Sequence, residues 1–169
     1  MTVAIGTATA IAADRLQTSS DGEFQAVGKI WVRRRWAIAM AGSVGVIWRT
    51  RQAPLTGDEP DFLARLADVA IEWAGKTNGA SVDILACHPE EGPWCLSGGG
   101  WARETPGVIG FCVGARAAWH ALGRPIEAPD LRQVVDAVSA AAPGLVGLGS
   151  DAMWWDGTAW VPDGPVPPC

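Results

Sequence analysis

The chain has 169 residues, 49% of them hydrophobic and 18% charged, so it can build one domain around a sizeable apolar core, and a mainly disordered state is excluded. Its formal net charge of −5 argues against a nucleic-acid partner, because phosphate binding needs clustered basic surface. No apolar stretch approaches the roughly 18–20 residues of a membrane span. The N-terminus also lacks the basic and apolar regions of a signal peptide, so we expect a cytoplasmic protein that does not bind membranes.

Four short strands are expected before the first helix. Residues 2–5 and 8–13 are small and apolar on either side of Gly6-Thr7, which predicts a tight hairpin of buried strands. Residues 24–32 and 36–41 predict a second pair of strands, joined by a turn of three arginines at 33–35.

Two helices are expected next. Residues 44–51 predict a short helix, and Asp61–Ala74 predicts a longer one because its apolar residues recur at helical spacing on one face. Asp61 is expected to cap the start of this helix, and Gly75 is expected to be the C′ residue after its end.

The rest of the chain repeats this order of strands, helices and strands. Apolar runs predict strands at residues 82–87, 94–96, 107–113, 153–155 and 158–161, the last two forming a hairpin around Asp156-Gly157. Helical patterns cover residues 115–122 and 130–142. This order predicts an α+β fold, a four-layer αββα sandwich of two antiparallel sheets with helices outside. Residues 1–161 are expected to form the single domain, and 162–169 a Pro-rich tail.

Thr2 is the first candidate for chemistry. Its small side chain allows removal of Met1, which would leave a hydroxyl and a free α-amine on one residue. The amine has a pKa of roughly 8 and can take the hydroxyl proton without a histidine. This is the nucleophile–base pair of N-terminal nucleophile enzymes.

Three further residues strengthen this interpretation. Asp14 ends the second strand, and a turn near Thr7 would bring it close to Thr2 across the hairpin. Lys29 lies within an apolar strand, in a chain whose 13 basic residues include only two lysines, and it could pair with Asp14 and favour an alkoxide at Thr2. Gly42 follows a strand, where a backbone N–H can bind an oxyanion.

The order of these segments resembles that of proteasome β subunits and the bacterial HslV peptidase. The resemblance runs from residue 2 to about residue 142. Its motifs are Thr2, the segment 11–15 (IAADR), Lys29-Ile30, Ala41-Gly42-Ser43 and the region 84–115.

The resemblance implies a role for each matching position. Thr2 would be the nucleophile and base, Asp14 and Lys29 the pair that polarises it, and Gly42 the oxyanion-hole donor. The remaining matches are Cys112, which takes the place of a serine that supports the amine, Asp151 as a second supporting carboxylate, and Met40 and Ser43 as substrate-binding residues.

The function implied is a threonine peptidase that cleaves peptides or unfolded proteins inside a ring of identical subunits, without a cofactor, and that an ATP-dependent unfoldase could supply with substrate. Two alternatives stay open: an inactive ring or scaffold subunit, and a small-molecule amidase that forms no ring. A zinc site at Cys87, His88 and Cys95 is not expected, because neighbouring strand residues point to opposite faces. The chain has four cysteines, which are expected to be reduced thiols: Cys87, Cys95, Cys112 and Cys169.

Overall fold

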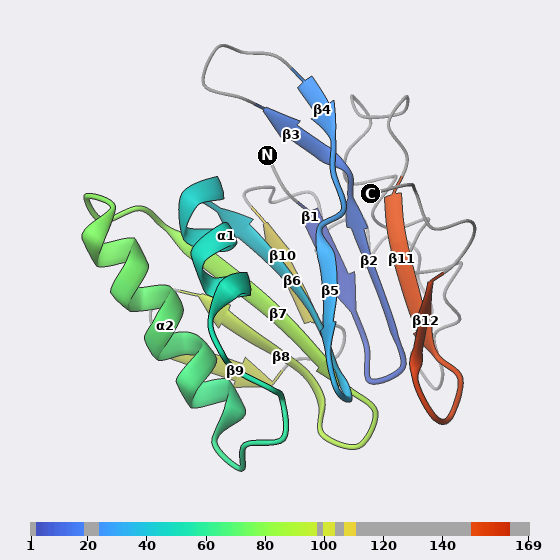
Figure 1. The fold of residues 1–169 in the computed structure, drawn as a ribbon. Coiled ribbons are helices and arrows are strands. Elements are labelled where there is room, and N and C mark those ends of the chain that lie inside the picture. The colour runs from blue at the N-terminus through green and yellow to red at the C-terminus, as the bar shows by residue number, and fades with distance from the viewer. Residues whose placement is uncertain (1–2, 19–23, 98–99, 104–106, 111–149, 163–169) are drawn as a thin grey trace.

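The computed structural model describes residues 3–18, 24–97, 100–103, 107–110 and 150–162. In these residues the chain forms two five-stranded sheets, a two-stranded hairpin and two helices (Figure 1). Every pair of neighbouring strands is antiparallel. Of the predicted segments, the helices at 115–122 and 130–142 lie outside the described residues.

The first sheet contains the N-terminal hairpin and has the strand order β10-β1-β2-β11-β12. Its strands are β1 (Val3–Gly6), β2 (Ala10–Asp14), β10 (Gly107–Gly110), β11 (Ser150–Trp155) and β12 (Trp160–Pro162). The register between β1 and β2 pairs Ala4 with Ala13, as expected for a turn near Thr7. The sheet therefore brings the two ends of the described chain together.

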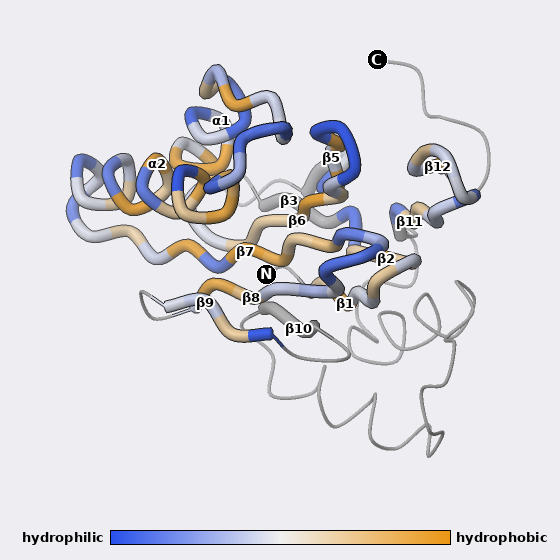
Figure 2. The backbone as a smooth tube through the Cα atoms, turned by 90° about the horizontal axis from the view of Figure 1, so that it is seen from below, coloured by the Kyte–Doolittle hydropathy of each residue, from blue (hydrophilic) through white to orange (hydrophobic). Residues whose placement is uncertain are grey.

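The second sheet is a meander with the order β5-β6-β7-β8-β9. Its strands are β5 (Ile30–Arg33), β6 (Trp36–Gly42), β7 (Val82–His88), β8 (Gly92–Ser97) and β9 (Gly100–Arg103). The helices α1 (Val44–Gln52) and α2 (Phe62–Lys76) cover one face of this sheet, and the first sheet lies against its other face (Figure 2).

Alternation along β6 explains this layering. Trp36, Ile38 and Met40 belong to the core that α2 covers, where they meet Phe62 and Leu66. The alternate residues are all alanine, and they belong to the core between the two sheets. Small side chains let the sheets approach closely: a Cβ at Gly6 would overlap the Cys87 Sγ. The described part of the chain thus has three of the predicted layers.

Several predicted boundaries were wrong. The predicted strand 24–32 is interrupted: β4 (Phe24–Ala26) pairs with β3 (Leu16–Thr18) in a separate hairpin, and β5 begins only at Ile30. Strand β9 was not predicted, because its four residues carry little apolar signal.

Gly75 does not end α2. The helix continues to Lys76, and the chain reverses at Asn78 and Gly79, which both have positive φ. Asp61 is the N-cap residue, but its side chain makes no capping hydrogen bond.

The last hairpin also differs from its prediction. Trp155 pairs with Trp160, so the loop has four residues instead of the two predicted at Asp156-Gly157. The Asp156 carboxylate accepts hydrogen bonds from the N–H groups of Thr158 and Ala159, which stabilises the longer turn. No helix among the described residues is long and apolar enough to cross a membrane.

Candidate active site

A buried ion pair joins the two sheets at one end. The Lys29 Nζ lies 2.7 Å from the Asp14 Oδ2, and the two side chains are 8% and 2% exposed. Asp14 is the last residue of β2, and Lys29 directly precedes β5. The sequence prediction that Lys29 pairs with Asp14 is therefore confirmed by the geometry. Buried charges are rare unless they are paired, so this contact is a specific feature of the fold.

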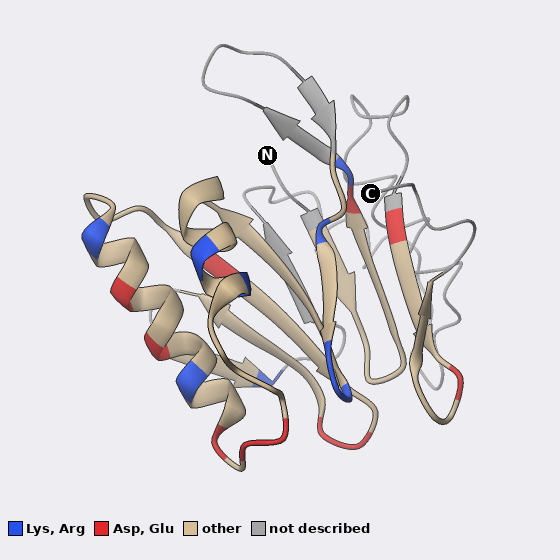
Figure 3. Cartoon of the chain, viewed as in Figure 1, with Lys and Arg blue, Asp and Glu red and all other residues tan. Residues whose placement is uncertain are grey.

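Asp151, far along the chain, contacts Lys29 and so extends the Lys29–Asp14 pair into a cluster of charged residues. Strand β11 pairs with β2 so that Asp151 lies opposite Ala13 and Ser150 opposite Asp14. The Asp151 Oδ2 accepts a hydrogen bond of 2.8 Å from the backbone N–H of Lys29. Its other carboxylate oxygen lies 3.3 Å from the Arg15 Nε. Asp151 thus fixes the backbone of Lys29, and Arg15 holds Asp151. In Figure 3, acidic and basic positions on the ribbon lie near one another where β2 ends and β5 and β11 begin.

The surroundings of Lys29 shift its pKa in opposing directions. Burial lowers the pKa of its ammonium group, and this effect outweighs the hydrogen bond to Asp14 and the negative charges of Asp14 and Asp151, which raise it. A lysine with a lowered pKa releases a proton more readily than a surface lysine does. Such perturbed groups are concentrated at functional sites.

Gly42 ends β6 at the same end of the second sheet. Ile30 pairs with Ala39, so the last residues of β6 extend past the start of β5, in the direction of Lys29. Gly42 has φ +129°, and a Cβ there would overlap the backbone carbonyl oxygen of Ser81. Only glycine fits this position.

Ser43 and Met40, the two expected substrate-binding residues, lie on either side of Gly42. Ser43 is the N-cap of α1; its N–H donates to the Ser81 carbonyl at 3.4 Å, and its own carbonyl accepts from the Ile47 N–H. The Met40 side chain is 2% exposed and packs in the core between the second sheet and the helices. Substrate contacts at both residues stay predictions.

Thr2 and Cys112, the predicted nucleophile and amine support, lie outside the described residues. The pairing of β1 with β2 shows which residue of β2 lies opposite Val3, the residue that follows Thr2. Continued by one residue, it sets Asp14 opposite Val3, which directly follows Thr2 in the chain.

Arg15 is the residue of this cluster to which the sequence analysis gave no role. It was present in the segment 11–15, but its contact with Asp151 depends on the pairing of β2 with β11.

The thiols of the described residues lie in the core between the two sheets. Cys87 and Cys95 are both buried, and burial raises the pKa of Cys87. No group of three or more His, Cys, Asp or Glu side chains placed to hold a metal occurs in the described ranges.

Comparisons with solved structures identify this arrangement of sheets and helices. The Anbu (Gly-1) mutant from Hyphomicrobium sp. strain MC1 superposes with a TM-score of 0.70 at 13% identity, over 95% of this chain and 85% of that one. HslV from Trypanosoma brucei gives 0.64 at 20% identity, over 90% and 97% of the two chains. BPH from Thiobacillus denitrificans, solved in complex with epoxomicin, gives 0.59 at 22% identity, over 91% and 98%. Neither the protein-family models nor the curated sequences compared with the chain give a match.

The class that these findings define is the N-terminal nucleophile hydrolase fold, a layered α+β sandwich. Within that class, the chain has the fold of the HslV and proteasome β-subunit type, as its sequence motifs indicated. Identities of 13–22% establish the fold and leave the activity to be argued from the site.

Proposed function

We propose that this protein is an N-terminal threonine peptidase that hydrolyses peptide bonds within a homo-oligomeric ring. The observation that carries the proposal is the buried Lys29–Asp14 pair, held by Asp151 at the sheet end where Gly42 also lies. A buried ion pair adds little net stability compared with apolar packing, so its presence here favours a chemical role. The fold, shared with HslV and BPH, supports the same interpretation.

The proposed reaction begins after Met1 is removed. The Thr2 α-amine takes the hydroxyl proton while Oγ1 attacks the peptide carbonyl, and the Gly42 N–H binds the resulting oxyanion. Lys29, positioned by Asp14 and Asp151, stabilises the negative charge that develops on the Thr2 oxygen.

Collapse of this intermediate breaks the peptide C–N bond. The protonated amine gives its proton to the leaving nitrogen, and an ester on Thr2 remains. Water, deprotonated by the same amine, hydrolyses the ester and restores the hydroxyl. In this scheme the Cys112 thiol supports the amine, as a weaker donor than a hydroxyl.

Specificity and assembly are further parts of the proposal. Met40 would form the floor of the pocket for the residue before the cut, with Ser43 beside it, which favours apolar side chains over charged ones.

Exposed apolar side chains at Val44, Trp48 and Trp154 support contacts between subunits. Twelve or fourteen copies of the 17.7-kDa chain would have a mass of roughly 210 or 250 kDa. A cytoplasmic location and an unfoldase partner complete the proposal.

Intact mass spectrometry of the natively produced protein tests the proposal. The mass should correspond to loss of Met1, and incubation with epoxomicin should add one inhibitor mass to the wild type but not to Thr2→Ala. Retention of Met1 in every molecule, with no adduct, would support the inactive scaffold subunit instead. Light scattering that finds only monomers at micromolar concentration, in a chain that is processed and active, would favour the amidase.

A further inference from the structure

A second polar site lies at the other end of the second sheet. A pocket of about 540 Å³ opens between the loop before α2, the first turn of α2 and the strands β6, β7, β8 and β9. Trp36, Trp94 and Trp101 contribute indole rings to its lining. Trp36 starts β6 and Gly42 ends it, so the pocket and the candidate active site are about 20 Å apart along this strand. Ligands of this pocket would not reach the catalytic residues.

The rim of the pocket is acidic. Four carboxylates line it, and none of the described lining residues is Lys or Arg; the four are Asp58, Glu59, Asp61 and Glu91. Figure 3 shows that the acidic loop before α2 and the acidic β7–β8 loop lie at the same end of the sheet.

Two of these carboxylates already have partners. Asp58 pairs with Arg34 at 2.9 Å. Glu59 accepts hydrogen bonds from the N–H groups of Thr56 and Gly57, which lower its pKa to about 2. Among the described residues, no Lys or Arg forms an ion pair with Asp61 or Glu91. Their negative charge therefore remains available at the rim of the pocket.

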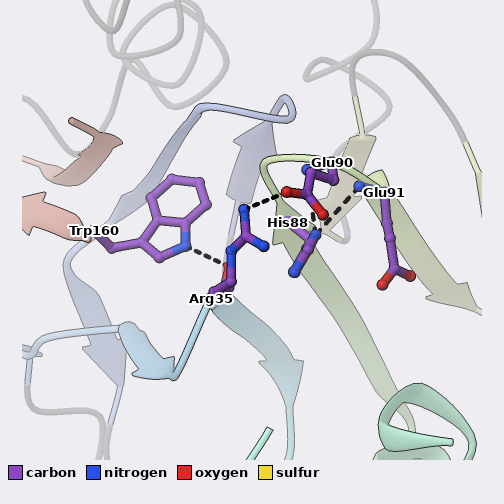
Figure 4. A network of polar contacts seen from close by, with 5 residues as sticks. All are labelled: Arg35, His88, Glu90, Glu91 and Trp160. Atoms are coloured by element: carbon purple, nitrogen blue, oxygen red, sulfur yellow. Dashed lines mark hydrogen bonds and ion pairs between the residues drawn. The ribbon is translucent and has the colours of Figure 1, made fainter. Parts of the chain in front are cut away.

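His88 gives the pocket a hydrogen-bond donor. Its side chain lines the pocket although the residue is only 7% exposed, and its ring lies 4.7 Å from the Trp36 ring, measured between centroids. Its Nδ1 accepts hydrogen bonds from the N–H groups of Glu90 and Glu91 (Figure 4). The proton of the neutral ring is therefore on Nε2. No described residue accepts a hydrogen bond from this Nε2.

Trp94 contributes a second donor without a partner. Its Nε1 is buried and has no acceptor in the described part of the chain. Buried donors are normally satisfied, so the Trp94 Nε1 is an exception, and the His88 Nε2–H beside it fits a ligand that carries a carbonyl oxygen. The Trp101 indole, in contrast, donates to the Leu63 carbonyl, which fixes one wall of the pocket against α2.

From this combination we propose that the pocket binds a peptide segment that contains arginine or lysine. The cationic head would lie between the carboxylates of Asp61 and Glu91, and the stem would pack on the indole rings. A neighbouring peptide carbonyl would accept the hydrogen bond of the His88 Nε2–H. A pocket of this volume accommodates a short segment of this kind.

Three small probes separate the parts of this proposal. Acetyl-arginine-N-methylamide carries both the cation and the carbonyls, agmatine carries the cation alone, and acetyl-citrulline-N-methylamide keeps the shape and the carbonyls without the charge. Calorimetry should give a Kd below about 1 mM for the arginine probe and weaker binding for agmatine. The citrulline probe should bind at least about tenfold more weakly than the arginine probe.

NMR spectroscopy places the binding event on the protein. The arginine probe should shift the indole N–H signals of Trp94 and Trp101, while that of Trp48, exposed on α1, stays unchanged. Uniform shifts of all three signals, or equal binding of the citrulline probe, would overturn the proposal.

Two rim variants and a matched control complete the test. Asp61→Asn and Glu91→Gln should each weaken the arginine probe about two- to fivefold, and the double variant about tenfold. Asp68→Asn, an exposed carboxylate on α2 away from the pocket, should leave the Kd unchanged. Unchanged binding by the double variant, or no binding of either cationic probe to the wild type at about 10 mM, would contradict the proposal.

Discussion

Replacing Lys29 by alanine removes one partner of the most deeply buried ion pair among the described residues. Asp14 would keep a carboxylate that is 2% exposed without this counter-charge. Loss of one partner from such a pair costs about 3–5 kcal/mol. For a chain of this size each kcal/mol corresponds to about 2–4 °C, so the melting temperature should fall by about 6–20 °C. Peptide turnover should be lost as well.

The other lysine of the chain supplies the control. Lys76 pairs with Glu72 on the surface of α2, and both side chains are more than half exposed. Lys76→Ala should change the stability by less than about 0.5 kcal/mol and leave turnover unchanged. If Lys29→Ala lowered the melting temperature no more than Lys76→Ala, the reasoning on burial would be refuted.

Lys29→Arg separates charge from geometry. The planar guanidinium is larger than an ammonium group and directs its charge differently, so turnover should fall as far as in Thr2→Ala although the charge is kept. The double variant Asp14→Asn/Lys29→Met should recover part of the stability that Lys29→Ala loses, without recovering activity. Near wild-type turnover in Lys29→Arg would refute the proposed active site.

The remaining predictions concern backbone strain and pH. Gly42→Ala should destabilise the fold by at least about 2 kcal/mol in a denaturant titration, because the Cβ would overlap the Ser81 carbonyl. Gly45→Ala, where the Cβ would meet only the Ser43 Oγ at an ordinary contact distance of 3.9 Å, should stabilise it by up to about 1 kcal/mol. Equal effects of the two substitutions would contradict the φ assignment. Burial lowers the pKa of His88 below its usual value near 6.5, so the stability contributed by the neutral ring is present above that pH and is lost as the pH falls through the lowered pKa. His88→Asn keeps an acceptor for the loop N–H groups and should remove this pH dependence of the melting temperature; a variant that retains it would show that another group titrates.

The sequence predicted the strands and helices whose burial is strictly periodic. In β6, alternation of large and alanine side chains marks two buried faces, and in α2 one apolar stripe marks the face on the sheet. Boundaries that depend on turn chemistry were harder to predict. The Asp156 side chain extends a loop from two residues to four, and the helix continues through Gly75 because the chain can reverse at Asn78 and Gly79 instead.

The candidate site was predictable where its residues lie close in the chain or match a family motif. Asp14 and Lys29 were found in this way, and their contact is direct. The link from Arg15 through Asp151 to the Lys29 backbone depends on the pairing of β2 with β11, which no local pattern encodes. The pocket at the opposite end of the sheet was missed for the same reason, because its lining comes from two loops, a helix and four strands.

The central claim is that the Thr2 hydroxyl is the nucleophile and that its own amine is the base. It is tested most directly by the turnover of a fluorogenic peptide by purified wild-type protein and Thr2→Ala, with the N-terminus of both established by intact mass. We predict that both lack Met1, that the wild type hydrolyses the peptide and that Thr2→Ala does not. Equal turnover by the two proteins, or turnover by molecules that all retain Met1, would contradict the claim.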